Sequence, residues 1–277
     1  MGITLYKNAD WILTVNEKRE KFRHGDLLIS GKEILDVGND LEKKYVGKLQ
    51  IDKTIDAKGT VILPGFVNVH HHTWQSLIRN IQATRGLKLE PWLTVMYEIY
   101  KDLNTDVARA GVYSGLGDML KTGCTTSNDL WYPHPVGVKY LVDAEIQAAA
   151  EIGIRFHPTR GFHSVPSDIV PPEVVDTKES VTEDTIRLVK KYHDRSRFSM
   201  CQVGIAPSIA QYETEDIIEA VVDLAEEYDI MVHGHLAESQ HEVEYTLKTW
   251  GCRPFEWFKR HRLLGKRFYF AHCIHLN

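Results

Sequence analysis

The sequence lacks the features that would tie this chain to a membrane or to nucleic acid. No apolar run approaches the roughly 18 residues of a membrane-spanning helix, and the opening residues MGITLYKNADW lack the basic-then-apolar build of a secretion signal. The formal net charge is −5 and the sequence pI about 6.3, so no basic excess suggests a nucleic-acid partner. We therefore expect neither a membrane nor a nucleic acid as partner.

Paired cysteines and phosphate-binding glycine motifs are missing as well. The four cysteines, Cys124, Cys201, Cys252 and Cys273, are scattered and form no C-x-x-C pair. This usage is typical of a reduced compartment, and we expect a cytoplasmic protein. Neither G-x-G-x-x-G nor a P-loop follows any predicted strand, which argues against nucleotide binding.

The 277 residues, 43% of them hydrophobic, are enough for one large domain or two smaller ones. Residues 1–62 read as a small β-domain, because ITLYKNADWILTV, GDLLISGKEILDVG and KTIDAKGTVILPG have the composition of short strands. Turns are predicted at residues 24–26, 30–32 and 57–59.

From residue 66 onward, short apolar strands alternate with longer helical patterns. Strands are predicted at Phe66–His70, Cys124–Leu130, Ile154–Pro158, Phe198–Ala206, Ile230–His235 and Phe268–His272. Helices are predicted at Val107–Lys121, Gly137–Ile152, Thr182–His193, Glu215–Glu227 and Val243–Arg260. Such alternation indicates a parallel sheet with crossover helices, either an open doubly wound sheet or most of an eight-fold barrel.

The most unusual stretch is PGFVNVHHHTW at residues 64–74, where an apolar run ends in three histidines. On a strand, His70 and His72 point to one face and could share a metal ion, while His71 points away. An isolated H-x-H is more often a surface cluster than a metal site.

Two further strands also end in histidine. IMVHGHLAES carries His233 and His235, with Glu238 three residues later, and FYFAHCIHLN carries His272 and then His275. The carboxyl ends of parallel strands meet at one rim of a sheet or barrel. The repeated pattern therefore favours a metal centre over coincidence.

These motifs resemble those of the amidohydrolase superfamily, in the branch of 8-oxoguanine deaminases, chlorohydrolases and cytosine-deaminase-like enzymes. The matching pieces, which span residues 63–276 in the family's order, are LPGFVNVHHHTWQSL, GCTTSND, GIRFHPTRG, HGHLAE and FAHCIHL. The resemblance implies a (β/α)8 TIM-type barrel over residues 63–277. It also implies that residues 1–62 are the N-terminal part of a small β-sandwich domain.

The resemblance assigns roles to single residues. It implies that His70, His72 and His235 bind the metal, that Glu238 is the acid/base group, and that His272 helps to polarise the attacking water. His233 and His275 match no ligand, so we expect them in the core or behind the ligands. The fourth strand, FSMCQVGIAPS, contains no lysine to bridge two metals. The implied cofactor is thus one divalent ion, zinc by preference, with iron as an alternative.

The implied reaction is hydrolytic deamination of an amino-substituted N-heterocycle, of the purine, pyrimidine or triazine type. Removal of chloride or an alkylamine at the same site is the close alternative, and a non-catalytic assembly homologue is the alternative of another class. Gln75, Arg160 and Trp74 are predicted to bind the substrate, and Asp129 to belong to the pocket wall. Leu130 and the loop APSIAQYE depart from the 8-oxoguanine deaminase pattern, which leaves the heterocycle open. Homo-oligomerisation also stays open.

The family's fourth protein ligand is an aspartate after an eighth barrel strand. Only six strands are predicted here, and the last lies close to Asn277. We expect the other two strands, and that aspartate, on a further part of the polypeptide or on another chain.

Overall fold

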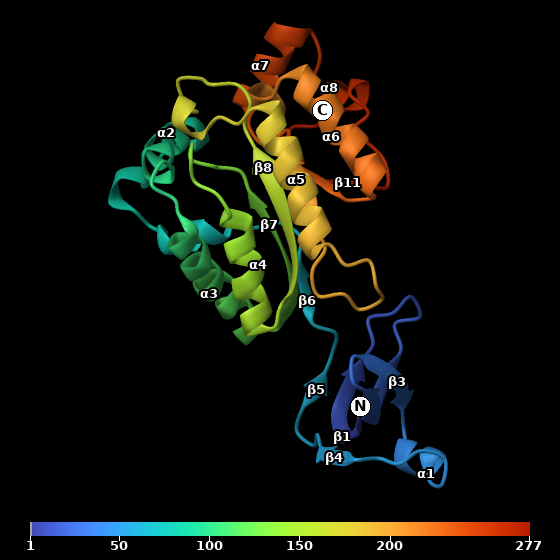
Figure 1. Ribbon diagram of the computed structural model, residues 1–277. Helices are drawn as coiled ribbons and strands as arrows, with labels where there is room; N and C mark the ends of the chain where they lie inside the picture. The colour runs from blue at the N-terminus through green and yellow to red at the C-terminus, as the bar shows by residue number, and fades with distance from the viewer. Residues whose placement is uncertain (1) are drawn as a thin grey trace. The chain divides into compact units, whose positions relative to one another are not determined.

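In the computed structural model, which describes residues 2–277, the chain forms two compact units: the first ends at Gly65 and the second comprises Phe66–Asn277 (Figure 1). The sequence places this division after residue 62.

The first unit contains one sheet of five strands: β1 (Ile3–Leu13), β2 (Lys21–Ser30), β3 (Glu33–Gly38), β4 (Lys53–Asp56) and β5 (Val61–Ile62). Their order is β3-β2-β1-β4, with β5 also pairing with β1, and the helix α1 (Leu41–Tyr45) follows β3. Within residues 2–65 there is no second sheet, so the β-sandwich stays a prediction. The turn predicted at residues 24–26 is wrong. β2 runs through it without a break, although His24 has a left-handed backbone (φ 48°). The one register shift between β1 and β2 is a bulge in β1 between Tyr6 and Ala9, where Asn8 is left-handed (φ 60°).

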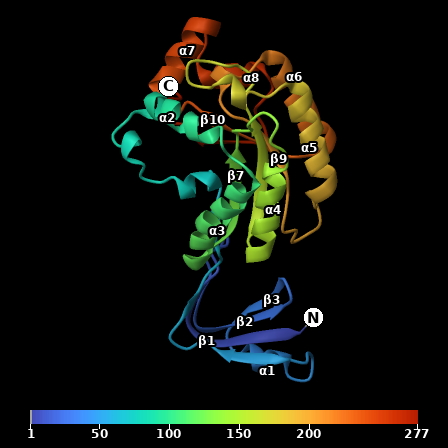
Figure 2. The same cartoon turned by 60° about the vertical axis from the view of Figure 1, so that its left-hand side comes forward.

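The second unit is built on a six-stranded parallel sheet. The strands are β6 (Phe66–Asn68), β7 (Cys124–Trp131), β8 (Arg155–Phe162), β9 (Gly204–Pro207), β10 (Val232–Leu236) and β11 (Phe268–His272), and each pairs with its neighbours in chain order. The sheet is curled like part of a barrel, as expected for six strands of a TIM-type fold. Figure 2 shows the same strands with the helices alongside them.

The helices of this unit are α2 (Leu89–Tyr100), α3 (Thr105–Lys121), α4 (Leu141–Ile152), α5 (Lys178–Tyr192), α6 (Glu215–Tyr228), α7 (Gln240–Trp250) and α8 (Pro254–Arg260). Short 3₁₀ segments lie at Thr73–Leu77, Gln82–Thr84, Pro172–Val174 and Ala210–Tyr212. Helices α3, α4, α5 and α6 pack against β7, β8 and β9, and their apolar stripes form the core with the sheet. On α6 the apolar stripe, which includes Ile217, Val221 and Leu224, is buried.

Three sequence predictions about elements need correction. The helix predicted over Val243–Arg260 is two helices, because Gly251 ends α7 in the left-handed region (φ 64°) and Pro254 starts α8. Helix α2 was not predicted. The strand predicted from Phe198 begins only at Gly204: Phe198 has a left-handed backbone (φ 64°), and before Gly204 the segment pairs only through an isolated bridge between Cys201 and Phe156.

Among residues 2–277 we find no helix with both the length and the apolar character needed to span a bilayer.

Candidate metal centre and active site

The predicted site residues come from the carboxyl ends of the parallel strands. His70 and His72 follow β6, whose ladder ends at Asn68, whereas His235 lies within β10 and His272 ends β11. Glu238 lies just past β10, before α7. Because all six strands run the same way, these ends share one edge of the sheet.

The structure brings the three predicted ligands together. One ring nitrogen from each of His70, His72 and His235 lies within 4.8 Å of the others, and among residues 2–277 this is the group of side chains spaced to hold a metal ion. Nε2 of His72 is 3.3 Å from Nε2 of His235. A tetrahedral ion about 2.0–2.1 Å from each nitrogen would separate two ligand nitrogens by about 3.3 Å.

Hydrogen bonds determine which nitrogen each ring presents. The Nδ1–H of His72 donates to the Leu130 carbonyl at 2.8 Å, and that of His235 donates to the Ser208 carbonyl at 2.6 Å. In a neutral imidazole the other nitrogen is then a bare acceptor. The lone pairs of the two Nε2 atoms, on His72 and His235, therefore face each other across 3.3 Å. They repel each other unless a cation lies between them.

The orientation of His70 is set through a second histidine. The Nδ1–H of His233 donates to the Tyr269 carbonyl at 3.0 Å, which leaves Nε2 of His233 to accept a proton from Nδ1 of His70 at 2.9 Å. Nε2 of His70 is thus also unprotonated. His233 supports a ligand from behind, and all three rings turn the same kind of nitrogen toward one centre.

The electrostatics of the cluster keep these rings neutral. Burial, reinforced by the neighbouring histidines, lowers the pKa of His70 to about 2. Burial likewise lowers the pKa of His72 to about 3, and that of His235 well below its usual value. A neutral imidazole is the form that binds metal, so the donor set fits a divalent ion that favours nitrogen ligands.

Glu238 and His272 lie beside the three rings. Nε2 of His272 is 3.4 Å from Oε1 of Glu238, and the His272 ring stacks on that of His235 with centroids 5.3 Å apart. Burial, followed by the charges of Glu242 and Glu90, raises the pKa of Glu238 to about 7, so this carboxyl can both give and take a proton near neutral pH. The Glu242 carboxylate accepts the backbone N–H groups of Ala237 and Glu238, which fixes the turn that carries the acid.

A cavity of about 420 Å³ opens onto this cluster, and its wall combines the polar residues above with apolar and aromatic side chains. Gln75 lines it, and its Nε2 donates to the Tyr100 hydroxyl at 3.0 Å. Sequence reasoning missed other lining residues, among them Trp92, Leu93 and Tyr97 of α2, together with His163. His163 follows β8 directly, so the histidine-after-strand signal that identified the other rings could have found it.

Trp74 does not line this cavity, which corrects its predicted role in substrate binding. The side chain is fully buried and packs on Trp131 and Tyr132, at centroid distances of 4.6 and 5.2 Å. The Trp74 ring also packs beside the ring of His72, with centroids 5.2 Å apart.

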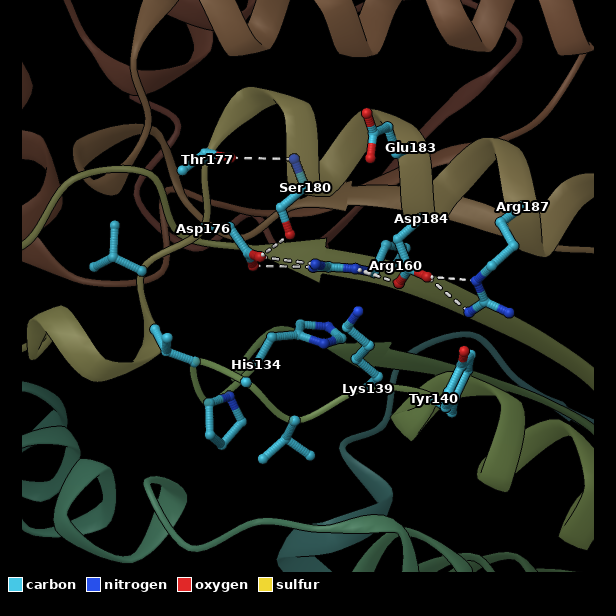
Figure 3. Close-up of a pocket in the computed structure, with 15 residues that line it drawn as sticks. His134, Lys139, Tyr140, Arg160, Asp176, Thr177, Ser180, Glu183, Asp184 and Arg187 are labelled. Carbon is cyan, nitrogen blue, oxygen red and sulfur yellow. Dashed lines mark hydrogen bonds and ion pairs between the residues drawn. The ribbon is translucent and has the colours of Figure 1, made fainter.

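Arg160 is also misplaced by the sequence prediction, because it faces a different pocket. Figure 3 shows its guanidinium between the carboxylates of Asp176 and Asp184, which it contacts at 2.8–3.0 Å. A further N–H donates to the Gly161 carbonyl. The side chain is 3% exposed and four of its five N–H donors bind groups of the protein, so it makes a buried ion pair instead of binding the substrate beside the histidines.

Comparison with known proteins identifies the family of this chain. The amidohydrolase family model matches residues 61–277. The 8-oxoguanine deaminase of Pseudomonas aeruginosa is 32% identical over 225 residues, covering 80% of this chain and 50% of that protein. The hydroxydechloroatrazine ethylaminohydrolase of Pseudomonas sp. strain ADP is 27% identical, covering 98% of this chain and 58% of that protein.

Solved structures show that relatives share the fold of this chain. The atrazine chlorohydrolase of Arthrobacter aurescens TC1, complexed with zinc, matches with a TM-score of 0.89 and 25% identity, covering 98% of this chain and 61% of that one. The chain spans 50% and 58% of the length of the two curated Pseudomonas relatives. With the family model matched over most of its length and its motifs in the family's order, the chain belongs to the amidohydrolase family.

Proposed function

We propose that this protein is a metal-dependent hydrolase that deaminates an amino-substituted N-heterocycle. The observation that carries the proposal is the convergence of three unprotonated imidazole nitrogens, from His70, His72 and His235, next to a carboxyl group whose pKa is about 7. A metal centre beside a tuned proton carrier is what hydrolysis of a carbon–nitrogen bond needs. The relatives that are themselves deaminases support this reading.

His70, His72 and His235 would hold the ion, one per chain, with zinc preferred and iron as the alternative. When bound, a divalent ion makes water nucleophilic at neutral pH. The zinc complex of the structural relative supports zinc. The aspartate ligand that the resemblance places after an eighth strand stays a prediction.

The protein's own residues would manage the protons. Glu238, 22% exposed, takes a proton at pH 7 and delivers it to the ring nitrogen next to the carbon under attack, and then carries one to the departing amine. His272, whose pKa burial lowers, stays neutral and can hydrogen-bond the attacking water. The Gln75 amide lies in the cavity wall, where it can read a carbonyl or ring nitrogen.

The substrate would be a small, planar heterocycle. The aromatic and apolar wall of the cavity, with Tyr132 and Trp92 in it, suits the face of such a ring. The four cysteines, none in a disulfide, support the prediction of a cytoplasmic enzyme.

Removal of chloride or an alkylamine is the second candidate, favoured by relatives named as an ethylaminohydrolase and a chlorohydrolase. A non-catalytic homologue is disfavoured, because buried histidines and a carboxyl with an elevated pKa destabilise a scaffold that does not use them.

Two measurements test the proposal. Metal analysis of the purified protein should find about one ion per chain, and His235→Ala should lose most of it; full metal content in the variant would refute the ligand assignment. In a panel of amino-, chloro- and alkylamino-substituted purines, pyrimidines and triazines, the amino-substituted compounds should release ammonia. Release of halide or alkylamine alone would replace deamination by the second candidate, and no turnover by the zinc-loaded full-length protein would favour the non-catalytic homologue.

A further inference from the structure

The segment that carries His70 and His72 is not held by the sheet ladder. β6 ends at Asn68, and residues 69–72 continue outside any regular element. What holds them is β7. The Leu130 N–H donates to the His71 carbonyl at 2.9 Å, and the Leu130 carbonyl accepts the Nδ1–H of His72. One residue of β7 therefore contacts two successive residues of the ligand segment.

Thr73 completes this attachment through two buried carboxyl groups. Its backbone N–H donates to Oδ1 of Asp129, on β7, and its hydroxyl donates to Oε1 of Glu145, on α4. All three residues are 0% exposed. Asp129 therefore lies beneath the ligand segment and not in the cavity wall, where the sequence places it.

The two carboxyl groups also interact with each other. Oδ2 of Asp129 and Oε2 of Glu145 are buried and receive no hydrogen bond from any donor. Beyond the effect of burial, the charge of Asp129 raises the pKa of Glu145, and two interacting carboxyl groups in a dry site avoid repulsion only if one of them keeps a proton, which we infer that they share. Burial raises the pKa of Asp129 to about 8 and that of Glu145 well above its usual value, so the proton is present at neutral pH.

Burying such a pair costs folding free energy. Removing two carboxyl groups from water is unfavourable, and apolar residues of the same volume usually pack at such a position with equal or greater stability. Packing alone therefore does not explain the pair. Its geometry does, because the proton-sharing pair offers Thr73 two fixed acceptors on two different elements, β7 and α4.

We propose that Thr73, Asp129 and Glu145 are positioning residues that hold the ligand His72 in its metal-binding orientation, a role that rests on the proposed function of His72 as a ligand. The hydroxyl and the backbone N–H of Thr73 anchor the residue that follows His72. The Leu130 carbonyl orients the His72 ring. Without the anchor, the ring would sample orientations in which Nε2 no longer faces His235.

The test removes the Thr73 hydroxyl without changing its shape. Thr73→Val should weaken zinc binding, measured by competition with a chromophoric chelator, by about tenfold to a hundredfold, the effect typical of losing an outer-shell partner. It should also change the visible absorption spectrum of the cobalt-substituted protein, which reports ligand geometry. Thr73→Ser, which keeps the hydroxyl, should restore both. Thr73→Ala repeats the deletion without the valine methyl, should the first variant not fold.

A matched control is available in α5. The hydroxyl of Thr185 is buried and has no partner, so Thr185→Val makes the same chemical change away from the histidines and should leave the zinc affinity unchanged. Zinc affinity in Thr73→Val or Thr73→Ala equal to that of the wild-type protein would overturn the proposal.

The role of the Asp129–Glu145 pair is tested by replacing Glu145 with glutamine, a neutral side chain of the same shape. Glu145→Gln can still accept from Thr73 and donate to Asp129, so it should bind zinc like the wild-type protein, whereas Glu145→Leu should resemble Thr73→Val. Equal loss in Glu145→Gln and Glu145→Leu would refute the shared-proton arrangement. His72→Ala separates the two hypotheses. If it keeps its zinc, the ligand assignment fails; if it alone loses zinc, the positioning role fails.

Discussion

Glu238 should make the metal-free protein less stable, because its carboxyl group is held where ionisation is unfavourable. The side chain is 22% exposed, and burial together with the charges of Glu242 and Glu90 raises its pKa from 4.5 to about 7. Replacing it by glutamine keeps the shape and removes the charge. We predict that Glu238→Gln is more stable than the wild-type protein at high pH and far less active.

The magnitude follows from linkage between ionisation and folding. Below pH 4.5 the carboxyl is protonated in both the folded and the unfolded state, so its ionisation contributes nothing to stability. As the pH rises to 7, the unfolded chain ionises while the folded protein resists. The shift from 4.5 to about 7 corresponds to a destabilisation of about 3 kcal/mol, reached at about pH 7 and retained above it. Since a buried amide is also desolvated, the net gain for Glu238→Gln should be about 2–3 kcal/mol.

Urea unfolding of chelator-treated protein at pH 5, 6, 7 and 8 measures this difference. The stability of the variant relative to the wild-type protein should grow from pH 5 to pH 7 and then level off. Glu219→Gln, at an exposed position of α6, is the control and should give no comparable gain. A stability difference that is independent of pH would refute the assignment of an elevated pKa to Glu238. Loss of a general acid should lower the turnover rate by about a hundredfold to ten-thousandfold.

Three further predictions concern other parts of the second unit. Arg160→Met leaves buried Asp176 unpaired, so urea unfolding should show a loss of about 3–5 kcal/mol, while the KM of the folded enzyme stays unchanged; a raised KM would restore Arg160 to substrate binding. Because the pKa values of His70 and His72 lie near 2 and 3, protons compete weakly for them, and chelator competition should show nearly constant zinc affinity from pH 8 to pH 6; a tenfold loss per pH unit would contradict these low values. Gln75→Ala should raise KM by about tenfold with little change in the turnover rate in steady-state kinetics; an unchanged KM would exclude Gln75 from substrate binding.

Some of the site could be read from the sequence because its signals are local. Apolar runs that end in histidine, alternating with helical patterns, place these side chains at one edge of a parallel sheet. His235 and Glu238 follow from this rule, since their spacing along one strand and its turn is fixed by the backbone. His233 and His235 share a face of β10, as strand periodicity requires, and both reach the cluster around His70.

Other features were decided by contacts between segments far apart in the chain. Arg160 lies in the part of β8 where every residue is buried, so its place in the strand does not tell which partners its side chain meets. Its direction depends on Asp176 and Asp184, contributed by a later loop and helix. Helix α2, which supplies part of the cavity wall, was missed for another reason: its buried Met96, Tyr97 and Tyr100 recur at helical spacing, so its periodicity could have been read from the sequence.

The sequence by itself determined the family and the order of most elements, and it singled out the three histidines that the structure brings together, because these depend on local periodicity and on motifs of residues adjacent in the chain. Only the tertiary structure decided which ring nitrogen each histidine presents, and that a buried threonine and two carboxyl groups lie beneath the ligand segment. The physical reason is that a ring nitrogen is chosen by the hydrogen bond on its other side, and for His72 that partner lies 58 positions further along the chain.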